Sequence, residues 1–368
     1  MELSPSVRWL EGLTPWPQEF GLERMRALLE RLGNPERAFD AIHVVGTNGK
    51  STTTRMVEEL LLANGVRAGA YVSPHVTGWR ERVRVGDREA DLERALERVR
   101  ADAETAGATQ FEVLTAAAFA EFRATGVAAA AVEAGLGGRL DATNVLSSKV
   151  VVLTNVGLEH TEWLGTTRDA IAAEKLAVVQ PGVPVILGEP EWEPLARRNG
   201  AGEVIVAAGG NLELARSAVE AYLGRDVDPE PAAAVSLPGR LEVVGDEIRD
   251  GAHTPEAVRY IAPRLPPLGS IVASMLEDKD VEGVLGELAP LCDTLVATAS
   301  SSPRALPAAT LADRARPLFK RVESVEEPAG AVARARELGR PVLVTGSLYL
   351  LADLAQARGV PWVAPPTS

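Results

Sequence analysis

Apolar residues along the chain form short runs, which predict buried strands, and helically spaced sets, which predict amphipathic helices. The run Ile-His-Val-Val at 42–45 predicts a buried strand, and the helix that begins at Lys50 stops at Asn64-Gly65. Further strands are predicted at 66–72, 126–132, 149–155 and 183–187, with helices at 19–33, 91–106, 111–125 and 167–179. Alternating strands and helices predict an α/β fold with a mostly parallel sheet and helices on both faces.

A stretch rich in Pro, Asp and Ala at 225–238 interrupts this alternation. Its composition is typical of a linker between domains. We therefore expect a first α/β domain at 1–224 and a smaller, Rossmann-like α/β domain at 239–368. Elements of the second domain are predicted at 241–249, 254–264, 269–275, 280–290, 293–298, 307–317, 327–338, 341–345 and 347–357.

The turn that follows the strand at 42–45 suits an anion. A glycine opens the turn, a second precedes a lysine that begins the helix, and two hydroxyl residues follow it. Backbone N–H groups in such a turn and the positive end of the helix favour a phosphate, while the lysine and a hydroxyl suit phosphate oxygens and Mg²⁺. An ordinary strand-to-helix turn shares these features, so the pattern alone leaves both interpretations open. The candidate ATP-binding residues here are Gly46, Thr47, Asn48, Gly49, Lys50, Ser51 and Thr52.

Composition narrows the class of protein. The 368 residues are 46% apolar, enough for real cores, and the 38 basic and 51 acidic residues give a net charge of −13. That balance argues against nucleic acid as the main partner. Cys292 is the only cysteine, so neither an intrachain disulfide nor a cysteine metal cluster is expected. No signal peptide pattern and no long apolar run appears, so we expect a cytoplasmic protein with no membrane partner.

Three residues beyond the glycine turn are candidates for metal chemistry, each with a plainer alternative. Glu133 ends the strand at 126–132 beside glycines, where a carboxylate suits a metal but could also face solvent. His160 follows the strand at 149–155; a lone histidine is often structural, and Mg²⁺ prefers oxygen ligands. Lys175 lies in the helix at 167–179, where a lysine is usually solvated.

The second domain offers a weaker set of candidates. Asp250 and His253 lie on a tight strand-to-turn transition, and Arg240 follows the linker, from where it could reach a phosphate. A turn aspartate, a surface histidine and an inert arginine are equally plausible. No motif for a serine or cysteine nucleophile and no HExxH zinc motif appears, so covalent catalysis has no support.

Taken in order, the motifs also carry a family resemblance. They are HVVGTNGKST at 43–52, YVSPHVTGWRERV at 71–83, FEVLTAAAF at 111–119, VEAGLGGRLDATNV at 132–145, LTNVGLEHTEWLG at 153–165, IAAEKLAVVQPGVPV at 171–185, LPGRLEVV at 237–244, DGAHTPEA at 250–257, MLEDKD at 275–280, SPRALP at 302–307 and PVLVTGSLYLLADL at 341–354. Together they resemble the folylpolyglutamate synthase/dihydrofolate synthase family, within the Mur ligase superfamily. SPHV…RERV and TGSLYL are particular to this branch.

The resemblance implies a P-loop NTPase-like, ATP-binding first domain and a glutamate-ligase second domain. It implies that ATP, with Mg²⁺, phosphorylates a carboxylate and that L-glutamate displaces the phosphate to form an amide. The substrates would be folate or dihydropteroate, L-glutamate and ATP, and the family is usually monomeric. Because an anionic carboxylate must approach an anionic phosphate, metal and lysine must neutralise both.

The resemblance also implies roles for the candidates. Lys50 would contact the outer phosphates, and Ser51 or Thr52 would bind the first Mg²⁺ with Glu133. His160 resembles the ligand of a second Mg²⁺, and Lys175 holds the position of a lysine that is carbamylated in this family, which would make it an anionic metal ligand. The implied catalytic residues are Lys50, Glu133, His160 and Lys175; the implied second-domain contacts to ATP and glutamate are Arg240, Asp250 and His253; the implied substrate-binding residues are Ser73, Pro74, His75 and Arg82.

The chain departs from the family pattern at several points. Ser51 stands where the family has glycine, which is closer to the cell-wall Mur ligases, and Thr254 replaces an asparagine. The region at 203–236 is short, and the family's HQxxN element is not reproduced at 211–215. Two alternatives therefore stay open: a Mur-type ligase of cell-wall precursors, and a nucleotide-binding relative with impaired catalysis.

Overall fold

The computed structural model describes residues 4–15, 17 and 19–356, which form two compact units. Of these residues, the first unit contains those up to Pro74 and Trp79–Val235, and the second contains His75–Gly78 and residues 236–356. Among the described residues, no helix is both long and apolar enough to cross a membrane. The two units are described separately below.

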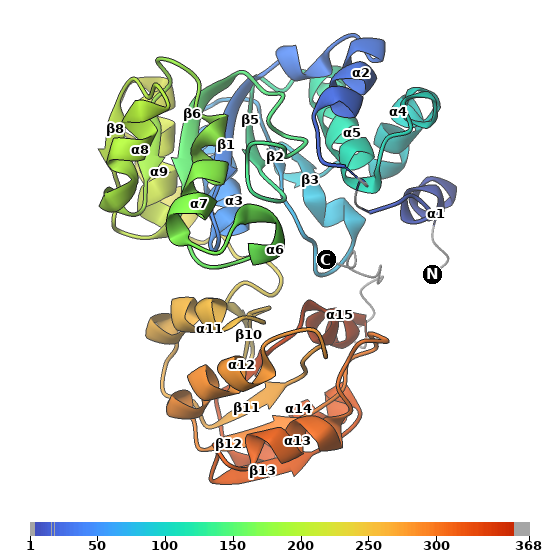
Figure 1. Cartoon of the computed structure of the whole chain (residues 1–368), viewed down its shortest axis with the longest axis vertical. Coiled ribbons are helices and arrows are strands. Elements are labelled where there is room, and N and C mark those ends of the chain that lie inside the picture. The colour runs from blue at the N-terminus through green and yellow to red at the C-terminus, as the bar shows by residue number, and fades with distance from the viewer. Residues whose placement is uncertain (1–3, 16, 18, 357–368) are drawn as a thin grey trace. The chain divides into compact units, whose positions relative to one another are not determined.

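The first unit is built on an eight-stranded sheet in the order β4-β3-β2-β5-β1-β6-β7-β8 (Figure 1). The central strand β1 pairs in parallel with β5 and β6, and only the β2–β3 and β3–β4 pairs are antiparallel. The strands are β1 (Asp40–Val45), β2 (Ala68–Tyr71), β3 (Val83–Val85), β4 (Arg88–Glu89), β5 (Ala129–Glu133), β6 (Ser148–Leu153), β7 (Val185–Leu187) and β8 (Val204–Val206).

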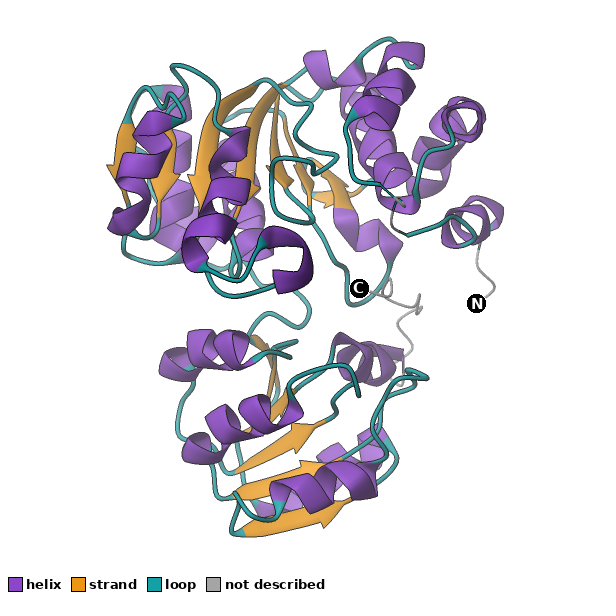
Figure 2. Ribbon diagram, in the orientation of Figure 1, coloured by secondary structure: helices purple, strands orange, loops and turns teal. Residues whose placement is uncertain are grey.

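Helices cover both faces of this sheet (Figure 2). Ile42 and Val44 of β1 pack with α3, α9 and α10 on one face, whereas Val45 packs with α7 and α8 on the other. This alternation is the two-residue period of a strand that is buried on both sides. The helices are α1 (Pro5–Glu11), α2 (Glu23–Arg31), α3 (Lys50–Ala63), α4 (Leu92–Ala106), α5 (Gln110–Thr125), α6 (Thr161–Leu164), α7 (Arg168–Lys175), α8 (Glu193–Arg198), α9 (Asn211–Leu223) and α10 (Glu230–Ala233).

The second unit has a six-stranded sheet in the order β13-β12-β11-β14-β10-β9, parallel except for the β9–β10 pair. Apolar clusters on both faces join it to its helices. Its strands are β9 (Glu242–Val244), β10 (Glu247–Arg249), β11 (Ser270–Ala273), β12 (Thr294–Ala297), β13 (Arg321–Ser324) and β14 (Val342–Thr345). Its helices are α11 (Pro255–Ile261), α12 (Val281–Leu288), α13 (Ala308–Ala315), α14 (Pro328–Leu338) and α15 (Leu348–Gln356).

The α/β class is confirmed, and the differences from the expected elements have local causes. The element expected at 241–249 is a hairpin, because Gly245 takes φ +65° and turns the chain between β9 and β10. The helix expected at 19–33 begins only at Glu23. Helix α9 and the strands β8 and β13 were not predicted; the two strands have no fully buried run to mark them.

The segment at 225–238, expected as a linker, is partly built into the first unit. It contains α10, and both Val227 and Ala232 are buried in the core beside α3. Pro229 is the N-cap of α10, and Asp228 accepts a hydrogen bond from the Glu230 N–H, so these residues start a short helix. The division between the units falls after Val235.

Candidate functional site

The glycine turn lies at the carboxyl end of the central strand β1. Gly46 has φ +148°, and a Cβ atom there would collide with the Thr154 side chain. Gly49 has φ +82° and is the N-cap of α3, so no side chain caps this helix. Lys50 is the first helical residue. The helix start therefore presents backbone N–H groups and a lysine, the arrangement that favours a phosphate.

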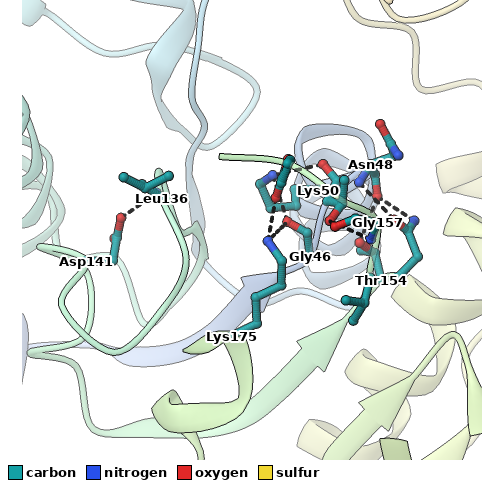
Figure 3. Close-up of polar contacts among 12 residues, drawn as sticks. Gly46, Asn48, Lys50, Leu136, Asp141, Thr154, Gly157 and Lys175 are labelled. Atoms are coloured by element: carbon teal, nitrogen blue, oxygen red, sulfur yellow. Dashed lines mark hydrogen bonds and ion pairs between the residues drawn. The ribbon is translucent and has the colours of Figure 1, made fainter. Parts of the chain in front are cut away.

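The end of strand β6 holds this turn in place (Figure 3). Asn155 accepts a hydrogen bond from the Asn48 N–H at 3.0 Å and donates its amide to the Asn48 carbonyl at 2.9 Å. The Thr154 hydroxyl donates to the same carbonyl at 2.7 Å, and the Gly157 N–H donates to the Thr47 hydroxyl at 2.9 Å. Thr154 and Asn155 were not among the site residues predicted from the sequence.

Two lysines converge on one carbonyl of the turn (Figure 3). Lys50 Nζ donates to the carbonyl oxygens of Gly46 at 2.9 Å and Thr47 at 3.1 Å. Lys175 Nζ donates to the same Gly46 oxygen at 2.7 Å. Two lysine side chains therefore bring positive charge to the glycine turn. This arrangement suits an anion such as a triphosphate.

Lys175 is buried, with 1% of its surface exposed, unlike the solvated lysine that a helix usually carries. Its Nζ pairs with Glu159 Oε1 at 2.5 Å. Burial lowers the pKa of Lys175 and Lys50 lowers it further, whereas Glu159 acts in the opposite direction. Burial alone would raise the pKa of Glu159, but Lys175 and Lys50 together hold it at about 2. Glu159 therefore balances part of the charge of the two lysines.

Glu133 is the second charged group at this edge of the sheet. Its side chain is 1% exposed at the end of β5. The Ser51 hydroxyl donates to Oε1 at 3.1 Å, and the Ser73 N–H donates to Oε2 at 2.9 Å. The structure thus brings Ser51 to this carboxylate, whereas no described hydrogen bond joins Thr52 to it.

The oxygen groups at this position fit a hard divalent cation. A buried carboxylate beside a hydroxyl and a phosphate-binding turn is a typical Mg²⁺ environment, since this ion takes few protein ligands and keeps waters and phosphate oxygens. Within the described ranges there is no group of three or more His, Cys, Asp or Glu residues that could hold a metal by themselves. His160 is exposed and is the N-cap of α6 with φ +46°. Its role as a metal ligand stays a prediction.

The residues expected to bind substrate differ in exposure. Ser73 and Pro74 are half-buried in the first unit, whereas His75 is buried and groups with the second unit. Arg82 is 2% exposed, and its guanidinium lies 4.7 Å from the Trp79 ring centre and 3.4 Å from the Ser73 hydroxyl. Burial lowers the pKa of Arg82 to about 10. Arg82 thus supports the Ser73 loop by a hydrogen bond to its hydroxyl.

A separate aromatic pocket of about 100 Å³ lies in the first unit. None of the four residues expected to bind substrate lines it. The Trp163 ring meets Phe20 edge-on at 5.1 Å, and Phe111 forms another part of the wall. The pocket was missed because its walls come from distant segments: Pro15, Pro17, Phe20, Gly21, Thr109, Phe111, Glu112, Leu136, Gly138, Leu140, Asp141, Ala142, Trp163, Leu164 and Glu174.

Two connections join this pocket to the glycine turn within the first unit. The loop that begins after Glu133 forms one wall, through Leu136, Gly138 and Asp141. In α7, Glu174 lines the pocket while its neighbour Lys175 reaches the Gly46 carbonyl. A Cβ atom on Gly138 would collide with the carbonyl oxygens of these two helix residues, so only glycine permits this close approach.

The second unit gathers its three candidates around the turn after β10. Asp250 is buried and accepts hydrogen bonds from the N–H groups of Leu241 and Ala252, each at 2.9 Å. Burial raises its pKa, although the nearby Arg240 lowers it. Arg240 donates to the Gly239 carbonyl at 3.1 Å, and His253 Nδ1 lies 2.8 Å from the Gly251 carbonyl. Arg240 and Asp250 are thus neighbours, and their contacts with ATP and glutamate stay a prediction.

Comparison with known proteins agrees with this geometry. Residues 44–184 match the family model described as the Mur ligase middle domain, and residues 239–348 match that of the Mur ligase, glutamate ligase domain. The matches define an ATP-dependent ligase of the Mur type. The dihydrofolate synthase/folylpolyglutamate synthase of Escherichia coli K12 is 31% identical over 415 aligned positions, covering 96% of this chain and 95% of the relative.

Solved structures give the same result. A structure of E. coli FolC in complex with DHPP and ADP is 31% identical, covers 97% of this chain and 98% of its own, and has a TM-score of 0.85. A bifunctional folylpolyglutamate synthase/dihydrofolate synthase with Mn, AMPPNP and L-glutamate bound is 30% identical, with a TM-score of 0.83 and coverage of 97% and 98%. The chain belongs to the folylpolyglutamate synthase/dihydrofolate synthase family of Mur ligases.

Proposed function

We propose that this ligase uses ATP and Mg²⁺ to join L-glutamate to the carboxylate of a folate, of dihydropteroate, or of both. The observation that carries the proposal is the arrangement around Gly46. Lys50 and Lys175 meet at its carbonyl, and the buried Glu133 is bound to Ser51 on the same helix start. This combination provides cations for a triphosphate and an oxygen ligand for a divalent ion.

The residues of the turn have separate roles in this proposal. The α3 N-terminus and Lys50 bind the phosphates, while Ser51 and Glu133 hold the divalent ion. When bound, that ion neutralises phosphate charge and so lowers the cost of bringing a carboxylate to the γ-phosphate. Lys50 leaves the loop carbonyls to reach the phosphates. Glu159, with its pKa held at about 2, stays ionised and keeps Lys175 in place.

The aromatic pocket would take the flat ring system of the pteroate substrate. Phe20, Phe111 and Trp163 supply apolar surface of the kind that stacks on a planar heterocycle. The loop after Glu133 forms part of the pocket wall, so one continuous segment joins the ring site to the metal site. The Ser73 loop, supported by Arg82, would then shape the path of the substrate's carboxylate tail.

The remaining assignments belong to the same proposal. Arg240, Asp250 and His253 would contact ATP and glutamate, and His160 would bind a second Mg²⁺. Carbamylation would turn Lys175 from a cation into an anion, so it would exchange its pairing with Glu159 for metal binding and leave Lys50 as the cation for the phosphates. Intact-mass measurement with and without bicarbonate tests the modification. A monomeric state is also proposed, and size-exclusion chromatography tests it. A cytoplasmic location is proposed as well, in keeping with the single Cys292.

The deciding experiment measures phosphate release at saturating ATP and Mg²⁺ with L-glutamate and either dihydropteroate or tetrahydrofolate. We expect release that depends on both glutamate and one of these acids, together with a product heavier by one glutamate residue. Release that is insensitive to both would contradict the proposal. The comparison of the two acids also tells dihydrofolate synthase from folylpolyglutamate synthase activity.

The GKST sequence of the turn favours a second candidate, a ligase of cell-wall precursors, because Ser51 replaces the family's glycine. A thermal-shift panel with dihydropteroate, tetrahydrofolate and a uridine-nucleotide precursor separates the two. Stabilisation by the uridine nucleotide alone would favour the second candidate. Binding of ATP without turnover on any acid would instead indicate a relative that has lost catalysis.

A further inference from the structure

A buried chain of polar side chains begins in the central strand and takes no part in the proposed chemistry. His43 Nε2 lies 2.8 Å from the Thr143 hydroxyl, and that hydroxyl donates to Asp141 Oδ1 at 2.5 Å. His43 is 1% exposed, Thr143 is fully buried and Asp141 is 5% exposed. Buried polar groups are costly unless they are paired, so such a network specifies one arrangement of the segments it joins.

The direction of these hydrogen bonds follows from the donor inventory. Asp141 Oδ1 accepts the Thr143 N–H at 3.0 Å as well as the hydroxyl, and Oδ2 accepts the Leu136 N–H at 2.7 Å (Figure 3). Thr143 has a single hydroxyl proton, which goes to the carboxylate. His43 must therefore donate from Nε2 to the Thr143 oxygen, which fixes its tautomer. Burial lowers the pKa of His43 to about 4, so the ring is neutral near pH 7.

The network ends on the loop that forms the pocket wall. By accepting the Leu136 N–H, Asp141 fixes the loop between Glu133 and itself, and Leu136, Leu140 and Asp141 all line the aromatic pocket. At its other end the network is anchored in β1, three residues before the glycine turn. The polar chain thus connects the strand that carries the nucleotide loop with the wall of the ring site.

We propose that His43 is a positioning residue for the ligase reaction, which fixes the pocket wall through Thr143 and Asp141 without contacting any substrate. This inference rests on the proposed function, in which the pocket holds the pteroate ring. Loss of the Thr143 hydroxyl leaves His43 without its acceptor, removes one of the hydrogen bonds that hold Asp141, and loosens the loop at 134–141. The affinity for the pteroate substrate then falls, while the glycine turn keeps its contacts with Asn155 and Thr154.

The test compares Thr143→Val with Thr143→Ser in the full chain. Valine keeps the shape but removes the hydroxyl, and we expect the KM for the folate or pteroate substrate to rise about tenfold, with the KM for ATP changed by less than about twofold. Thr143→Ser keeps the hydroxyl and should keep the wild-type KM. His43→Gln, whose amide can replace the Nε2 donor, is expected to behave like Thr143→Ser, and His43→Leu like Thr143→Val.

Thr298→Val is the matched control, because Thr298 is also fully buried and its hydroxyl donates to a carbonyl, that of Glu326 at 3.0 Å, in the second unit. It should lower the melting temperature without changing either KM. If Thr143→Val behaves like this control, or raises both KM values equally, the residue is merely structural and the inference fails.

Hydrogen exchange of the backbone amides at 134–141 separates this inference from the proposed function. We expect Thr143→Val to exchange these amides faster than the wild type, and Thr143→Ser to match the wild type, with no substrate present. Wild-type protein that does not turn over any folate would overturn the proposed function alone. Unchanged exchange in Thr143→Val would overturn the positioning role, whatever the substrate.

Discussion

The turn after β1 and the turn after β10 both connect a strand to a helix, but they differ in helix capping and in charge. After β1, Gly49 leaves α3 without a side-chain cap, and Lys50 and Lys175 bring positive charge to the loop. After β10, Thr254 caps α11 by accepting the Ala257 N–H, and the buried Asp250 accepts N–H groups of its own turn. In the second turn, Thr254 and Asp250 accept the backbone N–H groups, whereas in the first turn no side chain caps the start of α3.

The difference explains why the helix start after β1 suits a phosphate and the helix start after β10 does not. A helix N-terminus without a side-chain cap and with lysines nearby favours an anion. The N-terminus of α11 is already capped by Thr254, so the proposed contacts with ATP and glutamate there would come from side chains. Thr254 replaces the family's asparagine at a position where both residues cap well, so this departure does not disturb the turn.

Removing the charge at the first turn should have the largest effect. We expect Lys50→Ala and Glu133→Ala each to lower kcat/KM by about 10²–10³-fold or more. The first variant removes a cation that offsets phosphate charge, and the second removes the carboxylate proposed to hold the divalent ion. Phosphate release measures the effect, and circular dichroism checks that the fold persists. Lys149→Ala is the control, since this lysine is 58% exposed at the amino end of β6. Wild-type rates in either site variant would refute the assignment of the site.

The pH dependence of stability should separate the buried groups of the two regions. The pKa of His43 is depressed to about 4, so its contribution is present above pH 6.5 and is lost as the pH falls toward 4, with a slope of up to about 1.4 kcal/mol per pH unit. The pKa of Asp250 is raised, so its contribution is lost as the pH rises. Urea unfolding from pH 4 to 7 measures both slopes. His43→Gln should flatten the first slope and Asp250→Asn the second; an unchanged curve in both would contradict these environments.

The two hydroxyls that follow Lys50 should differ in their effect on metal binding. Ser51 donates to Glu133, so we expect Ser51→Ala to weaken Mn²⁺ binding in the presence of a non-hydrolysable ATP analogue by about tenfold. Electron paramagnetic resonance of free Mn²⁺ gives the affinity. Thr52→Ala is the paired variant. A larger loss in Thr52→Ala than in Ser51→Ala would assign the metal hydroxyl to Thr52.

The smallest effect is expected at the capped turn. Thr254→Ala should destabilise the protein by about 1 kcal/mol through loss of the cap, and Thr254→Asn should keep most of that stability. Thermal unfolding measures the change. If Thr254→Ala instead lowered turnover by a hundredfold with unchanged stability, the turn after β10 would be a catalytic element, and the contrast with the first turn would disappear.

Local pattern predicted the strand, glycine turn and helix of the nucleotide loop, because Gly46, Gly49 and Lys50 follow one another in the chain. It also placed Glu133 and His160 beyond strand ends, though the family resemblance supplied their roles. Pairing over long distances was out of reach: Asn155 binds Asn48 across 107 residues, and His43 meets Thr143 across 100. The burial of Lys175 had no local signal either, since it depends on packing of α7 against the sheet.

The pocket shows the same limit more strongly. Phe20, Phe111 and Trp163 are ordinary apolar residues in their own segments, and only the packed first unit brings them together. The linker at 225–238 shows the reverse error. Its Pro and Asp content correctly indicated irregular chain, but Ala232 is nevertheless buried in the core beside α3. Composition reports the lack of long elements and does not report burial.

A single peptide bond in α7 separates Glu174, which lines the aromatic pocket, from Lys175, which donates to the Gly46 carbonyl of the glycine turn. Because Glu174 and Lys175 are successive residues of one helix, a shift of the helix that moves one of them also moves the other. A one-residue insertion upstream in α7 would rotate both by about 100° and misplace both in one step. Given the proposed role of the pocket, redesign of the choice of acid should therefore leave α7 unchanged and vary the wall around Phe20 and Phe111.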